Sequence, residues 1–236
     1  MGFFEWIWDK IYALLIENGN YKMLLRAFGN TMLLALFAVL IGIVIGVVVA
    51  IGKVASAHSK KLFLVRWLCN LYITVIRGTP VYVQLLIFYF ALLPMLLKDK
   101  NSPLLAGAIT FGINSGAYVA EIIRAGIQSV DIGQTEASRS LGLSSFQTMK
   151  SIILPQAIKT ILPALGNEFI VLIKETAVIG VTSLYDLTKW AERVSSFTFE
   201  LLTPMLFVSL IYLILVLGLT KLLNIFERRL AKSDRG

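Results

Sequence analysis

Cysteine and histidine are almost absent from this sequence, which has one of each, Cys69 and His58. A single cysteine excludes an internal disulfide framework, and a single histidine leaves no second imidazole for a zinc site. We therefore assign packing or surface roles to both residues, and we expect no metal site and no cofactor in this chain.

Sequence patterns for nucleotide binding and for hydrolysis are missing as well. The nearest approach to G-x-x-x-x-G-K-[ST] is Gly46–Val54, where five residues separate Gly46 from Gly52 and no hydroxyl follows Lys53. No H-E-x-x-H, C-x-x-C, G-x-S-x-G or G-x-G-x-x-G pattern occurs. We expect no catalytic residue, which disfavours a membrane-embedded enzyme. If nucleotide drives this protein, ATP and magnesium bind to another chain.

Charged residues are scarce, at 15% against roughly 25% in an average soluble domain, and 57% of the residues are hydrophobic. These values place the chain among membrane proteins. The net charge of +8 does not indicate nucleic-acid binding, because the basic residues are scattered among long apolar runs. The first 20 residues have Glu5 and Asp9 where a signal peptide carries basic residues. Their aromatic side chains predict an amphipathic helix at the membrane interface over residues 1–23.

Five apolar runs are long enough to cross a membrane, which takes about 20 helical residues. They are Thr31–Gly52, Gly78–Leu97, Asn101–Ala120, Thr160–Tyr185 and Leu201–Thr220. The second run begins within the letters RGTP, at residues 77–80. These letters predict a helix start with Thr79 as the N-cap and Pro80 at the first helical position. Residues 62–76 are accordingly interpreted as a separate helix that leads into the membrane.

Positive charge near the ends of the spans predicts their orientation, since cytoplasmic loops are rich in lysine and arginine. The connection after the first span has four basic residues and no acidic one, and the tail after Thr220 has five basic residues against two acidic ones. We therefore predict an all-α integral membrane protein with the N-terminus outside and the C-terminus in the cytoplasm. Residues 24–229 form the transmembrane domain, which contains a cytoplasmic loop over 130–157, and residues 230–236 form the tail.

The polar stretch from Gln134 to Pro155 interrupts these apolar runs. We predict a short helix that Gly142 ends, a capping box formed by Ser144 and Gln147, and a second helix that Pro155 ends. Such a corner suits insertion into a groove of a partner protein. The side chains expected to be buried there are Ala137, Leu141, Leu143 and Phe146. An ordinary amphipathic connection is the alternative.

Residues of this stretch follow the pattern E-A-A, three residues, G, nine residues, I-x-L-P: Glu136-Ala137-Ser138, Gly142, then Ile152, Leu154 and Pro155. The stretch resembles the cytoplasmic coupling loop of permease subunits of ABC importers, from which only Ser138 departs, with serine for alanine. The stretches RGTPVYVQLLIFYF and FIVLIKETAVIGV are similar to the polar amino acid uptake group of these permeases.

The resemblance implies the type I importer permease fold in a bacterial or archaeal plasma membrane. It implies two ATPase subunits, a second permease subunit that is identical or paralogous, and an extracytoplasmic amino-acid-binding protein. The cargo would be an amino acid of the arginine, lysine, histidine or glutamine class, moved by alternating access. The residues that it assigns to ATPase coupling are Glu136, Ala137, Ser138, Gly142, Leu143, Ile152, Leu154 and Pro155.

Charged side chains within a span normally face protein or a water-filled cavity, because lipid solvates them poorly. Helical spacing predicts two polar stripes, one of Asn114, Tyr118 and Glu121 and the other of Thr176, Gly180 and Ser183. The predicted substrate pathway consists of Arg77, Asn114, Tyr118, Glu168, Lys174, Glu175 and Thr176. By the resemblance, Glu175 is the first candidate for substrate contact.

Two alternatives stay open at this point. Lys174, Glu175, Glu168 and Arg77 could instead form ion pairs that hold the spans or a dimer together, and Glu121 with Arg124 is expected to be a structural pair. As a whole, the chain could be a secondary transporter or channel without an ATPase, although such proteins need no docking loop. The identity of the amino acid and the choice between homodimer and heterodimer are open too.

Overall fold

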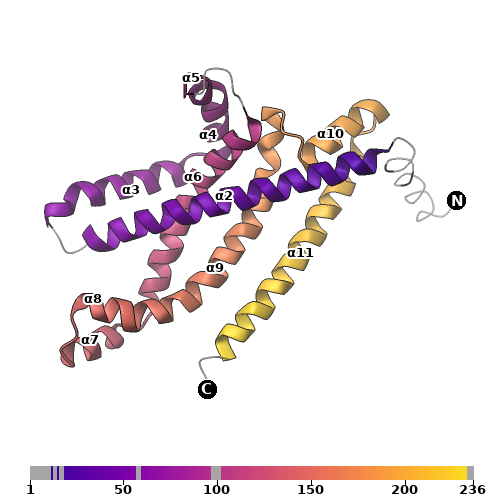
Figure 1. The fold of residues 1–236 in the computed structure, drawn as a ribbon. Coiled ribbons are helices and arrows are strands. Elements are labelled where there is room, and N and C mark those ends of the chain that lie inside the picture. The colour runs from indigo at the N-terminus through magenta and orange to yellow at the C-terminus, as the bar shows by residue number, and fades with distance from the viewer. Residues whose placement is uncertain (1–11, 13–14, 16–18, 57–59, 97–101, 233–236) are drawn as a thin grey trace.

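The computed structural model describes residues 12, 15, 19–56, 60–96 and 102–232, and the regular structure in these ranges is helical throughout (Figure 1). Of the predicted interfacial helix over residues 1–23, the structure describes residues 12, 15 and 19–23, and α2 begins at Asn20; the rest lies outside the described residues. The α-helices are α2 (Asn20–Ser56), α3 (Phe63–Gly78), α4 (Val81–Ile87), α5 (Leu93–Leu96), α6 (Pro103–Gln128), α7 (Ile132–Ser140), α8 (Ser145–Thr148), α9 (Leu154–Glu175), α10 (Leu187–Thr198) and α11 (Leu202–Lys232). Short 3-10 or π turns complete the order: η2 (Lys60–Leu62), η3 (Phe88–Leu92), η4 (Met149–Ile153) and η5 (Thr176–Thr182).

Among the described residues, three helices are long and apolar enough to cross a membrane, namely α2, α6 and α11. Residues 60–78 and 81–96 pass the same test as a pair that is bent by 103°, so the number rises to four if they count as one broken span. The predicted run Thr160–Tyr185 is split between α9 and the 3-10 turn η5. The predicted all-helical membrane architecture is confirmed, and the five-span count stays a prediction.

The predicted helix start at RGTP is wrong by one residue. Pro80, with φ −64° and ψ 131°, is the N-cap of α4, and Thr79 is the C-cap of α3. The hydroxyl of Thr79 donates to the carbonyl of Val75 at 2.8 Å and accepts from Gln84 Nε2 at 2.8 Å. It therefore closes the preceding helix instead of capping the next one.

Helix α3 is separate from the segment that follows it, with a bend of 103° between them, as predicted for residues 62–76, and its role as a lead into the membrane stays a prediction. It runs beside the C-terminal half of α2 (Figure 1), and a Cβ on Gly52 of α2 would lie 3.1 Å from Cys69 Sγ of α3. Its side chains Phe63, Trp67 and Leu71 are exposed apolar groups.

Helices α2 and α6 cross at close range through a G-x-x-x-G pattern on each of them. A Cβ placed on Gly46 of α2 would lie 2.4 Å from Val119 Cγ1, and one on Gly112 of α6 would lie 2.5 Å from Ile41 Cγ2. Gly42 and Gly116 leave equally little room. Small residues allow two backbones to approach in a membrane protein, where packing and not water drives helix association.

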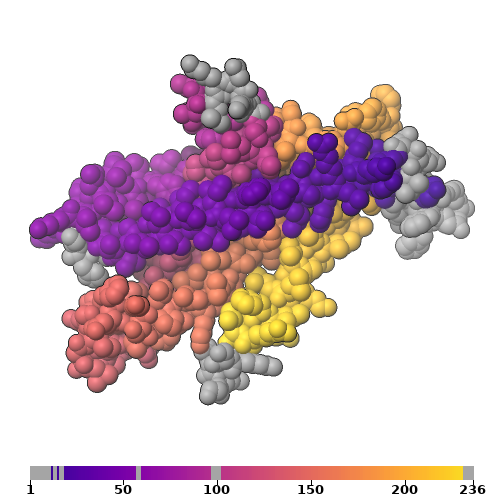
Figure 2. Space-filling view, viewed as in Figure 1, coloured from indigo at the N-terminus to yellow at the C-terminus, as the bar shows by residue number. Residues whose placement is uncertain are grey.

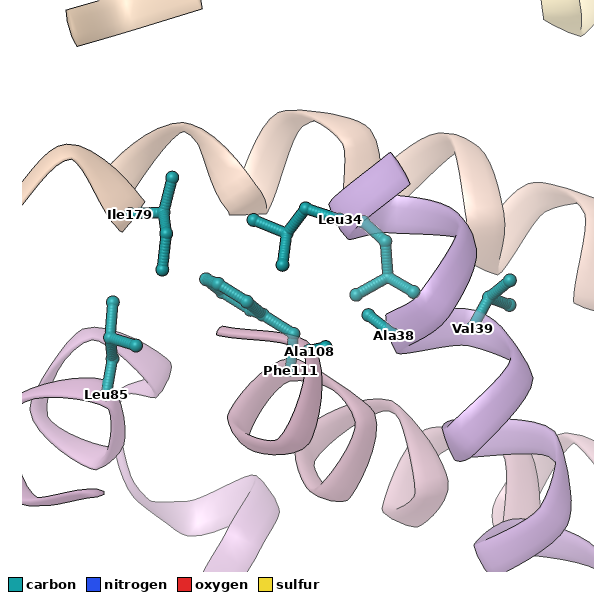
Figure 3. Packing of buried hydrophobic residues seen from close by; sticks show 8 residues of the cluster. Leu34, Ala38, Val39, Leu85, Ala108, Phe111 and Ile179 are labelled. Atoms are coloured by element: carbon teal, nitrogen blue, oxygen red, sulfur yellow. The ribbon is translucent and has the colours of Figure 1, made fainter. Parts of the chain in front are cut away.

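The ring of Phe111 on α6 lies at the centre of the buried apolar cluster that holds the helices around this crossing. Figure 3 shows it between Leu34 of α2, Leu85 of α4 and Ile179 of η5. A second cluster surrounds Trp190 of α10, whose indole Nε1 donates to the carbonyl of Asn20 at 3.2 Å. The two clusters join segments that are far apart in the sequence.

The predicted stripe of Thr176, Gly180 and Ser183 does not form, because the chain leaves α-helical geometry at Thr176. The hydroxyls of Thr176 and Thr182 donate to the carbonyls of Ile173 and Ile179 at 3.0 and 2.8 Å, which favours the tighter 3-10 turn. Thr176 is buried, whereas Ser183 is exposed and has a positive φ of 67°.

Candidate functional site

The polar stretch forms the predicted corner of two short helices, which we call the α7–α8 corner (residues 131–148). Asp131 is the N-cap of α7, since its Oδ1 accepts from the backbone nitrogen of Gly133 at 2.6 Å. The helix therefore begins at Ile132, two residues before the predicted start. Gly142 follows with a φ of +84°, a conformation that glycine adopts without steric cost, so its predicted role is confirmed.

The predicted capping box is present at the start of α8. Ser144 Oγ accepts from the backbone nitrogen of Gln147 at 3.2 Å, and Gln147 Oε1 accepts from the backbone nitrogen of Ser144 at 2.8 Å. Across the turn, Arg139 Nη1 donates to the carbonyl of Leu143 at 2.8 Å. These local bonds connect the two helices across the turn.

The prediction that Pro155 ends the second helix is wrong. Helix α8 passes into the π turn η4, and α9 follows from Leu154 onward, with Pro155 in its first turn. Proline is tolerated there because its missing N–H would have no partner in a first turn, and a π turn adds a residue that removes the clash with the preceding carbonyl. The chain is therefore helical from Ser145 to Glu175.

The α7–α8 corner exposes large apolar side chains, with Ile132 71%, Leu141 83% and Phe146 75% accessible. Figure 2 shows the corner as a projection at the lower left of the molecule. Glu136, Ala137, Gly142, Leu154 and Pro155 are exposed too, whereas Leu143 and Ile152 are half-buried and Ser138 is buried. Apolar groups that extend from a polar surface mark an interaction site.

The stripe predicted on α6 is a single face, and it lies against the bend between α3 and α4. Asn114 Nδ2 donates to Gln84 Oε1 at 3.1 Å, and the guanidinium of Arg77 lies 5.1 Å from the centre of the Tyr118 ring. Gln84 Nε2 also donates to the carbonyl of Ile76 at 2.8 Å. The candidate pathway residue Tyr118 thus contacts a second candidate, Arg77, and a third, Asn114, reaches the same bend through Gln84.

The first acidic residue of α9, Glu168, contacts α6 at Ser115, which is next to Asn114 in the sequence. Glu168 Oε1 accepts from Ser115 Oγ at 2.8 Å, Glu175 is half-buried and Lys174 is exposed. Within the described part of this chain, Arg77 is 4.0 Å from Glu121, and no ion pair joins Lys174, Glu175, Glu168 and Arg77 to one another. The alternative in which these four charges pair within one chain is therefore not what the structure has.

Sequence reasoning missed three residues that the structure connects to these groups: Lys53, Gln84 and Ser115. The ammonium of Lys53 lies 3.0 Å from Glu121 Oε1, and the expected pair of Glu121 with Arg124 is present at 2.8 Å. Of the three, only Gln84 had an indication in the sequence that it belongs to the site, because it lies five residues after Thr79 in the stretch RGTPVYVQLLIFYF.

The structure combines apolar helices long enough to span a bilayer with polar groups between them and an exposed helical corner. This combination is typical of a transport permease. Residues 42–232 match the family described as the binding-protein-dependent transport system inner membrane component, and the chain belongs to this family. The permease recognised from the coupling-loop pattern is thereby confirmed, together with its placement in an inner membrane.

Relatives cover most of the chain. A putative glutamine transport system permease protein GlnP of Rickettsia bellii (strain RML369-C) is 45% identical over 86% of this chain and 90% of its own length. The arginine transport system permease protein ArtQ of Bacillus subtilis (strain 168) is 38% identical over 89% of this chain and 94% of its own.

Solved structures agree with the fold. The chain matches a crystal structure of an amino acid ABC transporter with histidines at a TM-score of 0.83, with 42% identity over 92% of this chain and 98% of the other. An inward-facing structure of the MetNI methionine ABC transporter matches at a TM-score of 0.75 over 89% of this chain and 97% of the other, with 18% identity, and supports the fold alone.

Proposed function

We propose that this chain forms the translocation pathway of an ATP-driven importer of polar or basic amino acids. It acts with two ATPase subunits, a second permease subunit and an extracytoplasmic amino-acid-binding protein. The observation that carries this proposal is the α7–α8 corner, which exposes Leu141 and Phe146 and whose helix α8, with Phe146, continues through unbroken helix into α9. An ATPase groove that buries these side chains moves the helix that carries Glu168 and Glu175.

The topology that fits this function has five spans, with α9 as the fourth and the N-terminus outside. Helix α9 packs between α6 and α11, both of which pass the test for a span, and it leads directly out of the corner. Orientation by positive charge then places the corner in the cytoplasm, where the ATPases are. Modification of introduced cysteines by a membrane-impermeant maleimide checks this arrangement, and labelling of the corner from outside contradicts it.

The substrate pathway lies between α9 and the face of α6 that carries Asn114 and Tyr118. A zwitterionic amino acid needs a carboxylate near its ammonium group, and Glu175 is half-buried without an ion pair in the described part of the chain. Asn114 and Tyr118 add hydrogen-bonding groups, and Arg77 adds a cation for the substrate carboxylate. The chemistry suits glutamine and histidine as well as arginine and lysine.

Docking is tested by the double variant Leu141→Glu, Phe146→Glu, because two buried carboxylates would oppose entry into an apolar groove. We expect the variant to insert in the membrane and to lose copurification with the ATPase. Phe199→Glu is the matched control, since Phe199 is 96% exposed and lies after α10, at the end of the molecule away from the corner (Figure 1). Equal copurification of both variants excludes the docking role.

Substrate contact is tested by Glu175→Gln in the assembled transporter. We expect at least a tenfold loss in uptake of radiolabelled arginine, lysine, histidine or glutamine, with the ATPase still bound, because the amide has no charge for the substrate ammonium. Glu192→Gln is the control, since Glu192 pairs with Lys189 on the exposed side of α10. If uptake persists in vesicles without ATP or an ATPase, the chain is a secondary transporter or channel instead.

A further inference from the structure

A basic cavity of about 1040 Å³ lies where helices α2, α3 and α6 meet the α7–α8 corner. Its wall contains Lys53 of α2, Arg66 of α3, Arg124 of α6 and Arg139 of α7, and among the described residues Glu121 of α6 is the only acidic one that lines it. Four cations thus face one carboxylate. An anion that enters the cavity would offset this excess charge.

The single carboxylate, that of Glu121, already contacts three cationic side chains. Glu121 Oε1 lies 3.0 Å from Lys53 Nζ, its Oε2 lies 2.8 Å from Arg124 Nη2, and Arg77 reaches the same Oε2 at 4.0 Å. Arg66 is exposed, and among the residues that the structure describes it has no hydrogen-bond or ion-pair partner. Arg139 uses Nη1 on the carbonyl of Leu143, and its other donors have no partner in the part of the chain that the structure describes. The uncompensated charge therefore resides on Arg66 and Arg139.

The remaining polar residues of the wall suit the oxygens of a phosphate group. Asn70, Gln128, Thr135 and Ser145 line the cavity and can each donate a hydrogen bond without adding negative charge. Arginine binds phosphate with two parallel hydrogen bonds, which makes this combination of donors selective for a phosphate over a single-point anion.

The outer surface of α3 next to the cavity is apolar and exposed. Phe63 is 67%, Leu64 62% and Trp67 50% accessible, and these residues flank Arg66 in the sequence. Tryptophan beside arginine is typical of the zone between lipid headgroups and acyl chains. The same helix therefore offers a cation to the cavity and an apolar surface to the lipid.

We propose that this cavity holds the phosphate headgroup of an anionic phospholipid of the cytoplasmic leaflet, with its acyl chains along α3. Basic pockets between membrane helices on the cytoplasmic side suit such headgroups. The proposal rests on the cytoplasmic placement of the α7–α8 corner in the proposed function. Since Arg139 and Ser145 belong to that corner, the lipid would join it to α2, α3 and α6.

The test uses the permease copurified with its ATPase in a neutral detergent and titrated with phosphatidylglycerol, with bound lipid measured by native mass spectrometry. Each surface cation contributes about a fivefold factor in affinity for anionic lipid, so Arg66→Gln, Arg139→Gln should bind roughly 25-fold more weakly. Arg228→Gln, Arg229→Gln is the matched control, because it removes two exposed arginines from α11. Wild-type binding by the cavity variant overturns the proposal.

Two further arms identify the ligand and exclude misfolding. The double variant Arg66→Lys, Arg139→Lys keeps both charges and should retain most of the lipid. If it loses as much binding as the glutamine variant, the result contradicts a headgroup site held by charge. Phosphatidylcholine should not bind, and millimolar inorganic phosphate should not displace phosphatidylglycerol. Equal binding of phosphatidylcholine, or displacement by phosphate, overturns the assignment to an anionic lipid, and displacement identifies a soluble phosphate site.

The same samples separate this proposal from the proposed function. Copurification of the ATPase with the wild-type chain is scored first, and its loss overturns the importer assignment alone, because lipid binding can still be measured on the permease chain. Retained ATPase with equal lipid binding in all variants overturns the lipid site alone.

Discussion

The carboxylate of Glu121 on α6 lies 3.0 Å from the ammonium of Lys53 on α2, across 68 positions of sequence. The bond joins the two helices on the C-terminal side of their glycine crossing. Both residues line the cavity that the α7–α8 corner borders. The bond is half-buried, with about one fifth of each side chain accessible. An ion pair in this position contributes more than one on an open surface, because water screens it less.

Glu121→Gln removes the charge that Lys53 and Arg124 share, and we expect it to lower the free energy of unfolding by about 1–3 kcal/mol. Thermal unfolding in detergent, followed by tryptophan fluorescence, measures the change as a lower Tm. Glu192→Gln breaks an exposed pair with Lys189 within one helix and should shift Tm much less. Equal shifts in the two variants would show that the Glu121 cluster is as weak as a surface pair.

Gly46→Val should separate α2 from α6, because even a Cβ at this position would lie 2.4 Å from Val119 Cγ1 and 3.0 Å from the backbone nitrogen of Ala120. Overpacking of this kind costs about 1–3 kcal/mol or more. We expect a lower Tm and a lower yield of monodisperse protein on size-exclusion chromatography. Gly218→Ala is the control, since a Cβ there meets nothing within 4 Å; a wild-type Tm for Gly46→Val would refute close packing at the crossing.

Gly142→Val should deform the α7–α8 corner, since a β-branched residue at a φ of +84° is strained by about 1–2 kcal/mol. The strain is local, so we expect normal membrane insertion with reduced ATPase copurification and reduced amino acid uptake. Gly29→Ala changes a helical glycine with open space around it and should leave both measurements unchanged. Full ATPase binding by Gly142→Val would mean that docking tolerates another shape of the corner.

Asp186, at the start of α10 and outside the spans, should make stability depend on pH. Burial raises the pKa of this carboxyl from 3.8 to about 6, against the opposing effect of the backbone N–H groups of Lys189 and Thr188. The folded protein then holds a proton that the unfolded chain releases. The contribution of this carboxyl to stability is therefore fully present below about pH 4 and falls by about 3 kcal/mol as the pH rises to about 6.

Asp186→Asn tests this dependence, because the amide oxygen still accepts from the backbone nitrogen of Lys189 but does not titrate. Tm measured between about pH 4 and pH 7 should fall with rising pH in the wild type and should be flatter in the variant. Parallel curves for the two proteins would show that other groups set the pH dependence.

Features that depend on neighbours in the sequence were predictable. The φ of Gly142 and the capping box of Ser144 with Gln147 involve residues within four positions of each other, so composition and spacing suffice to predict them. The stripe of Asn114, Tyr118 and Glu121 was predictable for the same reason, because α6 keeps one helical period throughout.

Features that depend on distant partners, or on competition between two local bonds, were not predictable. Nothing near Lys53 in the sequence indicates Glu121, and the crossing of Gly46 over Val119 needs the fold to bring the helices together. At Thr79 the hydroxyl could cap either of two helices, and its bonds to Val75 and Gln84 decide for the first. Pro155 was expected to break a helix because the π turn before it has no sequence pattern of its own.

That π turn has a mechanical consequence. With helical hydrogen bonding from Ser145 to Glu175, α8 and the two acidic residues of α9 belong to one continuous helical segment, whose length along the chain is roughly 45 Å at 1.5 Å per residue. No loop lies along this segment to absorb a displacement. A push on Phe146 is therefore transmitted to Glu168 and Glu175 through helix, and within this segment it can be absorbed at the wide turn at Met149–Ile153 and at the proline at position 163.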